Sequence, residues 1–280
     1  TIIGKQALQA NTTASHNTAV GYQSLFANTT GADSNAFGAF ALDANTTGGD
    51  NNAFGRSALG ANTTGSLNTA MGHGAVDANT TGNHNTGFGA NVLNDSTTGS
   101  ANTAAGYRAL FSNTTASNNN AFGFQALYSN TTGAVQTAMG HAALNANTTG
   151  TENTAFGGAA LLDNTTGNYN VAVGRNALAN NTTASGNTAV GYDALNSNTT
   201  ASGNVAIGTN AGKASTTAIN GVFVGSSAGT TVTTGNDNTC IGYLTGYAGN
   251  GANKLTTGHG NILLGSSSNV AATNNYYSIV

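Results

Sequence analysis

Residues 17–33 read NTAVGYQSLFANTTGAD, and residues 34–50 repeat the same order of small, apolar and polar positions. The glycine after the apolar residue, Gly21 in this stretch, recurs every 17 residues at fifteen positions from Gly4 to Gly242. Leu stands four residues after this closing glycine, and an Asn-Thr-Thr triplet begins three residues after Leu. One period therefore reads N-T-A-Φ-G-x-x-A-L-x-x-N-T-T-G-x-x, where Φ is an apolar residue.

A strict period of 17 residues favours one coil of a β-solenoid, because helical repeat units usually exceed 30 residues. The Thr-Ala-Φ stretch alternates between two faces as a strand does, and the glycine after it permits a sharp turn. The chain has no Pro, as expected where every strand needs its N–H for pairing. The sequence predicts an all-β protein, a parallel β-solenoid or β-roll whose Asn and Leu residues stack in columns.

The strand Ala and the Leu are expected inside the coil, since they are the small and apolar positions that recur most strictly. The leucines of this predicted core, the leucine column, are Leu25, Leu42, Leu59, Leu93, Leu110, Leu127, Leu144, Leu161, Leu178 and Leu195. One exception in the run is Val76.

The Φ residue faces away from Ala, because neighbouring residues of a strand point to opposite faces. One Leu per coil gives a thin core, so we expect Φ to pack against sister chains in a homotrimer. The apolar stripe predicted to form this contact comprises Val20, Phe37, Phe54, Met71, Phe88, Phe122, Met139, Phe156, Val173, Val190 and Ile207.

The composition excludes several classes of function. Six Lys and Arg residues cannot build a surface that tracks a phosphate backbone, so no nucleic-acid partner is expected. No apolar run reaches the length of about 20 residues that spans a bilayer, so no membrane insertion is expected. The five His, the scattered acids and the lone Cys240 show no metal or catalytic spacing. We expect no enzymatic activity, catalytic residue, metal or cofactor.

The position after each closing glycine varies in size and polarity, which predicts that it is exposed. Tyr, His and Arg at such positions can contact sugar rings and hydroxyls, although the same side chains could simply shield the grooves between coils. The candidate glycan-contact residues of this variable column are Tyr22, Arg56, His73, Tyr107, Phe124, His141, Arg175, Tyr192 and Tyr243.

The unit changes after Leu195. Residues 1–208 form the regular repeat, and residues 209–280 form modified C-terminal repeats in which Gly212, Gly229 and Gly246 replace Leu. The step from Gly242 to Gly265 contains a six-residue insertion. We expect a wider loop there and a more apolar strand, typical of the terminal coils of a solenoid.

The eleven Asn-Thr-Thr triplets match the N-glycosylation pattern. The same residues serve equally well for amide ladders and turns, and this second interpretation is favoured. Stacked Thr pairs also resemble the flat Thr arrays of ice-binding solenoids.

The repeat N-T-A-Φ-G…A-L…N-T-T-G resembles the shafts of phage tail fibres over residues 1 to about 246. It is also similar to the S-V-A-I-G repeats in the left-handed β-roll heads of trimeric autotransporter adhesins, although Thr takes the place of their first apolar residue in most coils. The resemblance implies a homotrimeric attachment fibre on a virion or cell surface, with a cell-surface carbohydrate or another host receptor as partner. The alternatives are a bacterial surface adhesin or extracellular filament subunit and, less favoured, an ice-binding β-solenoid.

Overall fold

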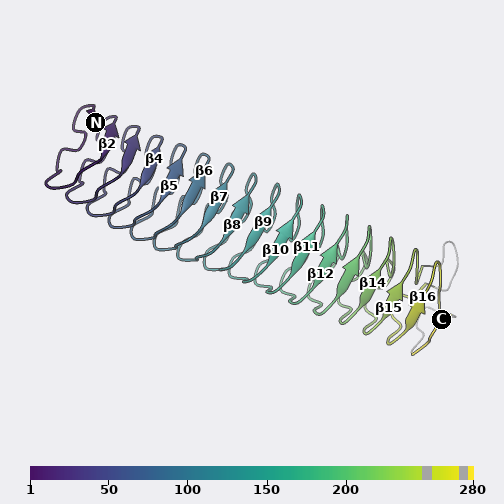
Figure 1. Cartoon of the computed structure of the whole chain (residues 1–280). Coiled ribbons are helices and arrows are strands. Elements are labelled where there is room, and N and C mark those ends of the chain that lie inside the picture. Colours follow the sequence, from purple (N-terminus) through teal and green to yellow (C-terminus); the bar gives the residue numbers. More distant parts are fainter. Residues whose placement is uncertain (248–253, 271–276) are drawn as a thin grey trace. The chain divides into compact units, whose positions relative to one another are not determined.

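The computed structural model describes residues 1–247, 254–270 and 277–280 and divides the chain into two units, Thr1–Gln136 and Thr137–Val280. In each unit, every coil contributes one short strand that pairs in parallel with the strand of the next coil (Figure 1). The described residues form no helix. The predicted all-β parallel β-solenoid with 17-residue coils is therefore confirmed.

The strands have the same place in every coil. In the first unit they are β1 (Ile2–Ile3), β2 (Thr18–Val20), β3 (Asn35–Phe37), β4 (Asn52–Phe54), β5 (Thr69–Met71), β6 (Thr86–Phe88), β7 (Thr103–Ala105) and β8 (Asn120–Phe122). In the second they are β9 (Thr137–Met139), β10 (Thr154–Phe156), β11 (Val171–Val173), β12 (Thr188–Val190), β13 (Val205–Ile207), β14 (Val222–Val224), β15 (Thr239–Ile241) and β16 (Ile262–Leu264).

Consecutive strands pair in register, so like residues stack on like. Ala36 lies opposite Ala19 on one side and Ala53 on the other. These strand alanines are completely buried, whereas the residues on either side of them are partly exposed. The alternation expected of the Thr-Ala-Φ stretch therefore places Ala inside the coil.

The closing glycine brings two coils closer than any other residue could. Gly38 has a φ of 139°, and a Cβ added to it would lie 2.5 Å from the carbonyl oxygen of Gly55 in the next coil. L-residues rarely adopt this backbone conformation, and the space is filled by another backbone. The 17-residue spacing of these glycines is thus a requirement of the stacking itself.

All ten residues of the leucine column are completely buried, and all adopt the left-handed backbone conformation. Leu110, for example, has a φ of 52°. This conformation costs an L-residue roughly 1–2 kcal/mol, while burying a leucine side chain contributes about 1.5–3 kcal/mol. Burial therefore offsets the backbone strain, a feature that the sequence pattern did not predict.

Two columns of buried asparagines complete the coil interior. Asn45 donates from Nδ2 to Asn28 Oδ1 in the preceding coil, at 2.8 Å, and to the Gly48 carbonyl, at 2.9 Å. In the second column, Asn68 donates to Asn51 Oδ1 from its backbone N–H, at 3.0 Å, and from Nδ2, at 3.2 Å. Each amide satisfies backbone groups at a corner while bonding to its neighbour in the stack, which limits the desolvation cost of a polar core.

One ladder weakens wherever Ser takes the place of Asn. Asn79 Oδ1 and Asn198 Oδ1 have no hydrogen-bond partner among the described residues. In both cases the residue 17 positions later is a serine, Ser96 or Ser215, which lacks the amide donor of asparagine. The unpartnered atoms are therefore a direct consequence of the two substitutions in the repeat.

The modified C-terminal repeats lie within the second unit. Phe223 takes the place of the strand Ala and is completely buried. Its ring occupies the interior next to Gly212, Gly221 and Gly229, where an added Cβ would collide with ring atoms. The predicted six-residue insertion falls largely on residues 248–253, which lie outside the described residues.

Candidate functional site

The candidate sites of this molecule lie on its surface. The described part of the chain contains no pocket, and among its residues no group of three His, Cys, Asp or Glu side chains could hold a metal ion. Nor do residues 1–247, 254–270 and 277–280 form a helix of the length and hydropathy that crossing a bilayer requires. The candidate sites are therefore exposed columns of side chains.

The apolar stripe lies on the outer face of the strands. Val20, Phe54 and Val190 are half-buried, and the other eight members are 37–43% exposed. Phe37 and Phe54 stack with ring centroids 4.9 Å apart. In the second unit the stripe is a continuous row of large apolar side chains from Met139 to Ile207, whereas in the first unit Ala105 interrupts the row between Phe88 and Phe122. A substantial part of these side chains remains in contact with solvent.

The variable column is exposed as its composition suggested: Tyr22, Arg56, His73, Tyr107, Phe124, His141, Arg175, Tyr192 and Tyr243 are all exposed. Tyr107 and Phe124 occupy consecutive coils and stack with their ring centroids 5.7 Å apart. One face of each ring is therefore used within the column, and only part of the ring is available to a sugar.

An aromatic cluster that the sequence analysis missed extends from this pair. Phe111 stacks on Tyr128 at 5.4 Å, and the Arg108 guanidinium carbon lies 5.1 Å from the Tyr107 ring centroid and 5.4 Å from that of Phe111. Phe111 and Tyr128 stand five residues after their closing glycines. A comparison of that column between adjacent coils predicts the second stacked pair, because both positions hold an aromatic residue.

In the Asn-Thr-Thr triplets, the asparagine lies inside the coil and the threonines lie at its surface. Ten of the eleven asparagines are completely buried, and Asn11 alone is exposed. Attachment of a glycan to a buried Nδ2 would require the coil to open. The structure therefore favours the ladder interpretation of the triplets over glycosylation.

The two threonines of each triplet also differ. The first is half-buried in most coils and donates to a carbonyl of the next coil, as Thr46 Oγ1 does to the Thr63 carbonyl at 3.0 Å. The second is exposed in every described coil, from Thr13 to Thr257, and its hydroxyl makes no hydrogen bond among the described residues. One free hydroxyl and one methyl group per coil thus face the solvent.

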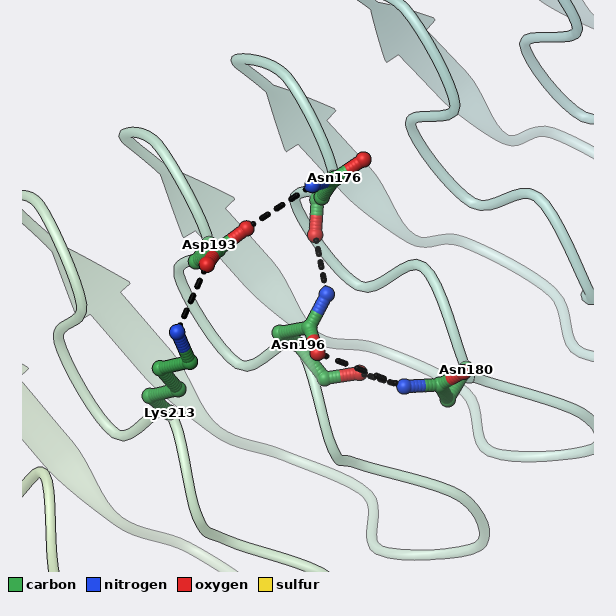
Figure 2. A network of polar contacts seen from close by, with 5 residues as sticks. All are labelled: Asn176, Asn180, Asp193, Asn196 and Lys213. Atoms are coloured by element: carbon green, nitrogen blue, oxygen red, sulfur yellow. Dashed lines mark hydrogen bonds and ion pairs between the residues drawn. The ribbon is translucent and has the colours of Figure 1, made fainter.

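A polar network surrounds Asp193, whose side chain is 9% exposed. Lys213 Nζ donates to Asp193 Oδ2 at 2.7 Å, and Asn176 Nδ2 donates to Oδ1 at 3.0 Å (Figure 2). Burial of the carboxyl works to raise its pKa, but these hydrogen bonds and the Lys213 charge outweigh burial, so the pKa of Asp193 is lowered. Asn196 and Asn180 extend the network along the coils.

The pKa values of several other groups are shifted in the opposite direction, upward, at Asp43, Asp77, Asp95 and Cys240. Burial raises the pKa of Asp43, and the charge of Asp77 adds to the rise. Both carboxyls point toward Gly60, since a Cβ there would lie 2.5 Å from Asp77 Oδ1 and 3.6 Å from Asp43 Oδ1. Burial also raises the pKa of the Cys240 thiol to about 12, so this cysteine is unreactive at neutral pH.

The geometry is that of an extended surface with repeated contacts. No protein-family model matches the chain, and no curated protein matches it.

Proposed function

We propose that this chain is a structural attachment fibre, the shaft of a phage tail fibre, that assembles as a homotrimer and contacts a host-cell carbohydrate. The observation that carries the proposal is the apolar stripe on an in-register β-solenoid. Most coils bury one leucine and two small side chains, while a second large apolar side chain remains 37–43% exposed.

The stripe supports self-association because large exposed apolar patches mark interaction surfaces. Nearly every coil offers an apolar side chain at the same spacing, so two copies aligned in parallel would match along the stripe within each unit. Three copies around one axis would close all the stripes against one another.

The assembly is tested by measuring the mass of the purified chain with light scattering. The expected mass is three times the chain mass of 27.4 kDa. Phe156→Asp, which places a carboxylate in the stripe, should reduce the mass to that of the single chain or cause aggregation, because an unpaired charge in an apolar interface is costly.

Tyr169→Asp is the matched control, because Tyr169 is 60% exposed and lies outside the stripe. This variant should keep the mass of the unmodified chain. A stable 27.4 kDa species for the unmodified chain would contradict the trimer, and so would equal loss of mass in both variants.

Ice binding is a second candidate, favoured by the exposed threonine row. The second threonine of the triplet recurs in every described coil although its hydroxyl makes no hydrogen bond there. Coils of a parallel sheet are about 4.8 Å apart, so the row presents regularly spaced hydroxyls and methyls to water. Thermal hysteresis at micromolar protein, abolished by Thr81→Lys with Thr98→Lys, would support it; no hysteresis in the unmodified chain would exclude it.

A further inference from the structure

The densest aromatic surface in the first unit surrounds Arg108. The guanidinium lies between the rings of Tyr107 and Phe111, at 5.1 and 5.4 Å from their centroids. Each of these rings stacks on a ring of the next coil, Phe124 or Tyr128. A cation held by two rings has fewer positions available than a free surface arginine, so its charge is fixed in place.

The stacking decides which part of each ring a ligand can reach. Tyr107 and Phe124 lie with an interplanar angle of 27°, and Phe111 and Tyr128 with one of 15°. Faces that meet within a stack are closed to a sugar ring, whereas Tyr107 and Phe124 remain 43% and 45% exposed. The edge of an aromatic ring carries the positive part of its quadrupole. These edges therefore suit oxygen-rich, anionic groups better than the apolar face of a neutral sugar.

The charge of Arg108 points to the same kind of ligand. Among the described residues, no carboxylate forms an ion pair with Arg108, and its buried Nε has no hydrogen-bond partner. Arg108 is one of only six Lys and Arg residues in the chain. A guanidinium that has no acidic partner and lies over the faces of two aromatic rings keeps N–H groups available for a carboxylate or phosphate oxygen.

We propose that the cluster of Tyr107, Arg108, Phe111, Phe124 and Tyr128 binds the anionic group of an acidic saccharide. This inference rests on the proposed attachment function and names the chemical class of its receptor. Arg108 supplies charge-assisted hydrogen bonds to the anionic group. The Tyr107 and Tyr128 hydroxyls bind neighbouring sugar hydroxyls, and the ring edges contact the remaining oxygens.

The test is binding of the full chain to three oligosaccharides of equal length: an oligogalacturonate, a phosphorylated oligomannose and a neutral maltooligosaccharide. At least one anionic probe should bind, and the neutral one should bind much more weakly. The two anionic arms distinguish carboxylate from phosphate recognition. Arg108→Gln should weaken the anionic probe by about tenfold or more, as loss of a charged hydrogen bond does.

Lys5→Gln is the control, because Lys5 is an exposed cation that is not among the candidate glycan-contact residues and has no aromatic contact among the described residues. It should leave binding unchanged, with both variants melting as the unmodified chain does. Equal weakening by both variants would show non-specific charge attraction and overturn the proposal, as would unchanged binding in Arg108→Gln or equal binding of the neutral probe.

Binding to bacterial cells separates this inference from the attachment function. If Arg108→Gln binds cells as the unmodified chain does and neither anionic probe binds, the acidic-saccharide site is wrong and attachment still stands. If an anionic probe binds through Arg108 but the chain attaches to no cells, the site stands and the attachment function is wrong.

Discussion

The leucine coils and the coils around Phe223 fill the same interior in two different ways. In a leucine coil, the strand contributes Ala, and a Leu in the left-handed conformation supplies the volume from the opposite side. Around Phe223 the strand contributes the large side chain, and Gly212 and Gly229 occupy the left-handed positions, with φ of 58° and 59°. The backbone conformation is the same in the two regions. The side chain that fills the interior of the coil comes from the leucine position in one region and from the strand in the other.

A third arrangement supports the same rule. Where Val76 replaces Leu, Val92 replaces the usual Ala, and Gly87 replaces the strand Ala. A Cβ on Gly87 would lie 2.8 Å from Val76 Cγ2 and 3.0 Å from Val92 Cγ1. The side-chain volume lost at Val76 and Gly87 is again replaced, here by the larger side chain of Val92. The coil therefore requires a nearly constant interior volume, as close packing demands, and tolerates changes in which residue provides it.

The largest effect is expected where the two regions do not differ. Gly106→Ala in a leucine coil and Gly225→Ala next to Phe223 should each destabilise by about 4 kcal/mol or more. The new Cβ would lie 2.5 Å from the Gly123 carbonyl oxygen in the first case and 2.6 Å from that of Gly242 in the second. Denaturant unfolding monitored by circular dichroism would measure both costs.

Gly186→Ala is the control, because Gly186 has positive φ but nothing within 4 Å of its Cβ position. Its column elsewhere holds non-glycine residues such as Asp33 and Asn118 in the same conformation, so we expect a cost below about 1 kcal/mol. If Gly225→Ala were tolerated while Gly106→Ala was not, the backbone would differ between the regions after all.

The next effect should distinguish the two packings. Phe223→Ala removes a completely buried ring that no neighbouring side chain can replace, because its neighbours at 212, 221 and 229 are glycines. The expected cost is about 3–5 kcal/mol. Because coupling in a solenoid runs between nearest neighbours, hydrogen exchange should rise in the adjacent coils and stay low near Gly157.

Phe223→Leu keeps much of the lost volume and should recover about half of the cost. A uniform rise of hydrogen exchange over the second unit would show that the coils unfold as one block and would contradict local coupling.

In the leucine coils, we expect replacement of Leu by Gly to destabilise the fold no more than replacement by Ala. Leu110→Ala removes a buried side chain and should cost about 2–5 kcal/mol. Leu110→Gly removes one carbon more but relieves the left-handed backbone, at a φ of 52°, so it should cost no more than the alanine variant. Glycine is usually worse than alanine in regular structure. Chemical unfolding of the two variants side by side measures the difference.

A Leu110→Gly variant that is clearly less stable than Leu110→Ala would mean that the left-handed leucine is not strained. The occurrence of Gly212 and Gly229 in this column would then need an explanation other than the space occupied by Phe223.

The repeat period predicted the coil because backbone pairing forces like residues to stack. One glycine in phase, one strand and one leucine per 17 residues were sufficient. The left-handed leucines were not predictable from preferences, since an isolated leucine avoids that conformation. The exchange of volume between Leu and Phe223 was visible as Gly212 and Gly229, but its meaning requires knowing which positions face each other across the coil.

For the exposed columns, the sequence predicted which residues lie outside the coil but not which of them contact one another. Variation in size showed that Tyr107 and Phe124 lie outside, since a buried column tolerates little variation. The cluster around Arg108 was missed, because it joins three columns that are separated along the sequence by one and three residues. Their meeting depends on the turns at Arg108 and Leu110, which both have positive φ.

The smallest effect on the free energy of unfolding is expected at the contact between the last leucine coil and the first coil packed around Phe223. Asp193 belongs to the coil of Leu195, and Lys213 follows Gly212 in the next coil, with 2.7 Å between Nζ and Oδ2. The lowered pKa of Asp193 means that its carboxylate stabilises the fold above its ordinary pKa of 3.8, and that this contribution is lost as the pH falls through the lower, folded pKa. Because the Lys213 side chain is 42% exposed, solvent screening limits the gain to about 0.5–1 kcal/mol. Lys213→Met should remove it, which unfolding at pH 7 and pH 2.5 would measure.

Asp43 gives the opposite sign within a leucine coil and so provides the control. Its pKa is raised above 3.8 by burial and by Asp77, so the folded state binds the proton more tightly than the unfolded state. Stability should then decrease as the pH rises from 3.8 through the folded pKa. Asp43→Asn should make that decrease smaller, and Asp77 and Asp95, whose pKa values burial also raises, account for the remainder. Lys213→Met should leave this segment of the pH profile unchanged and alter only the acid limb. A Lys213→Met variant with the unmodified acid limb would show that the Lys213–Asp193 pair does not stabilise the junction, which would then depend on packing and backbone hydrogen bonds alone.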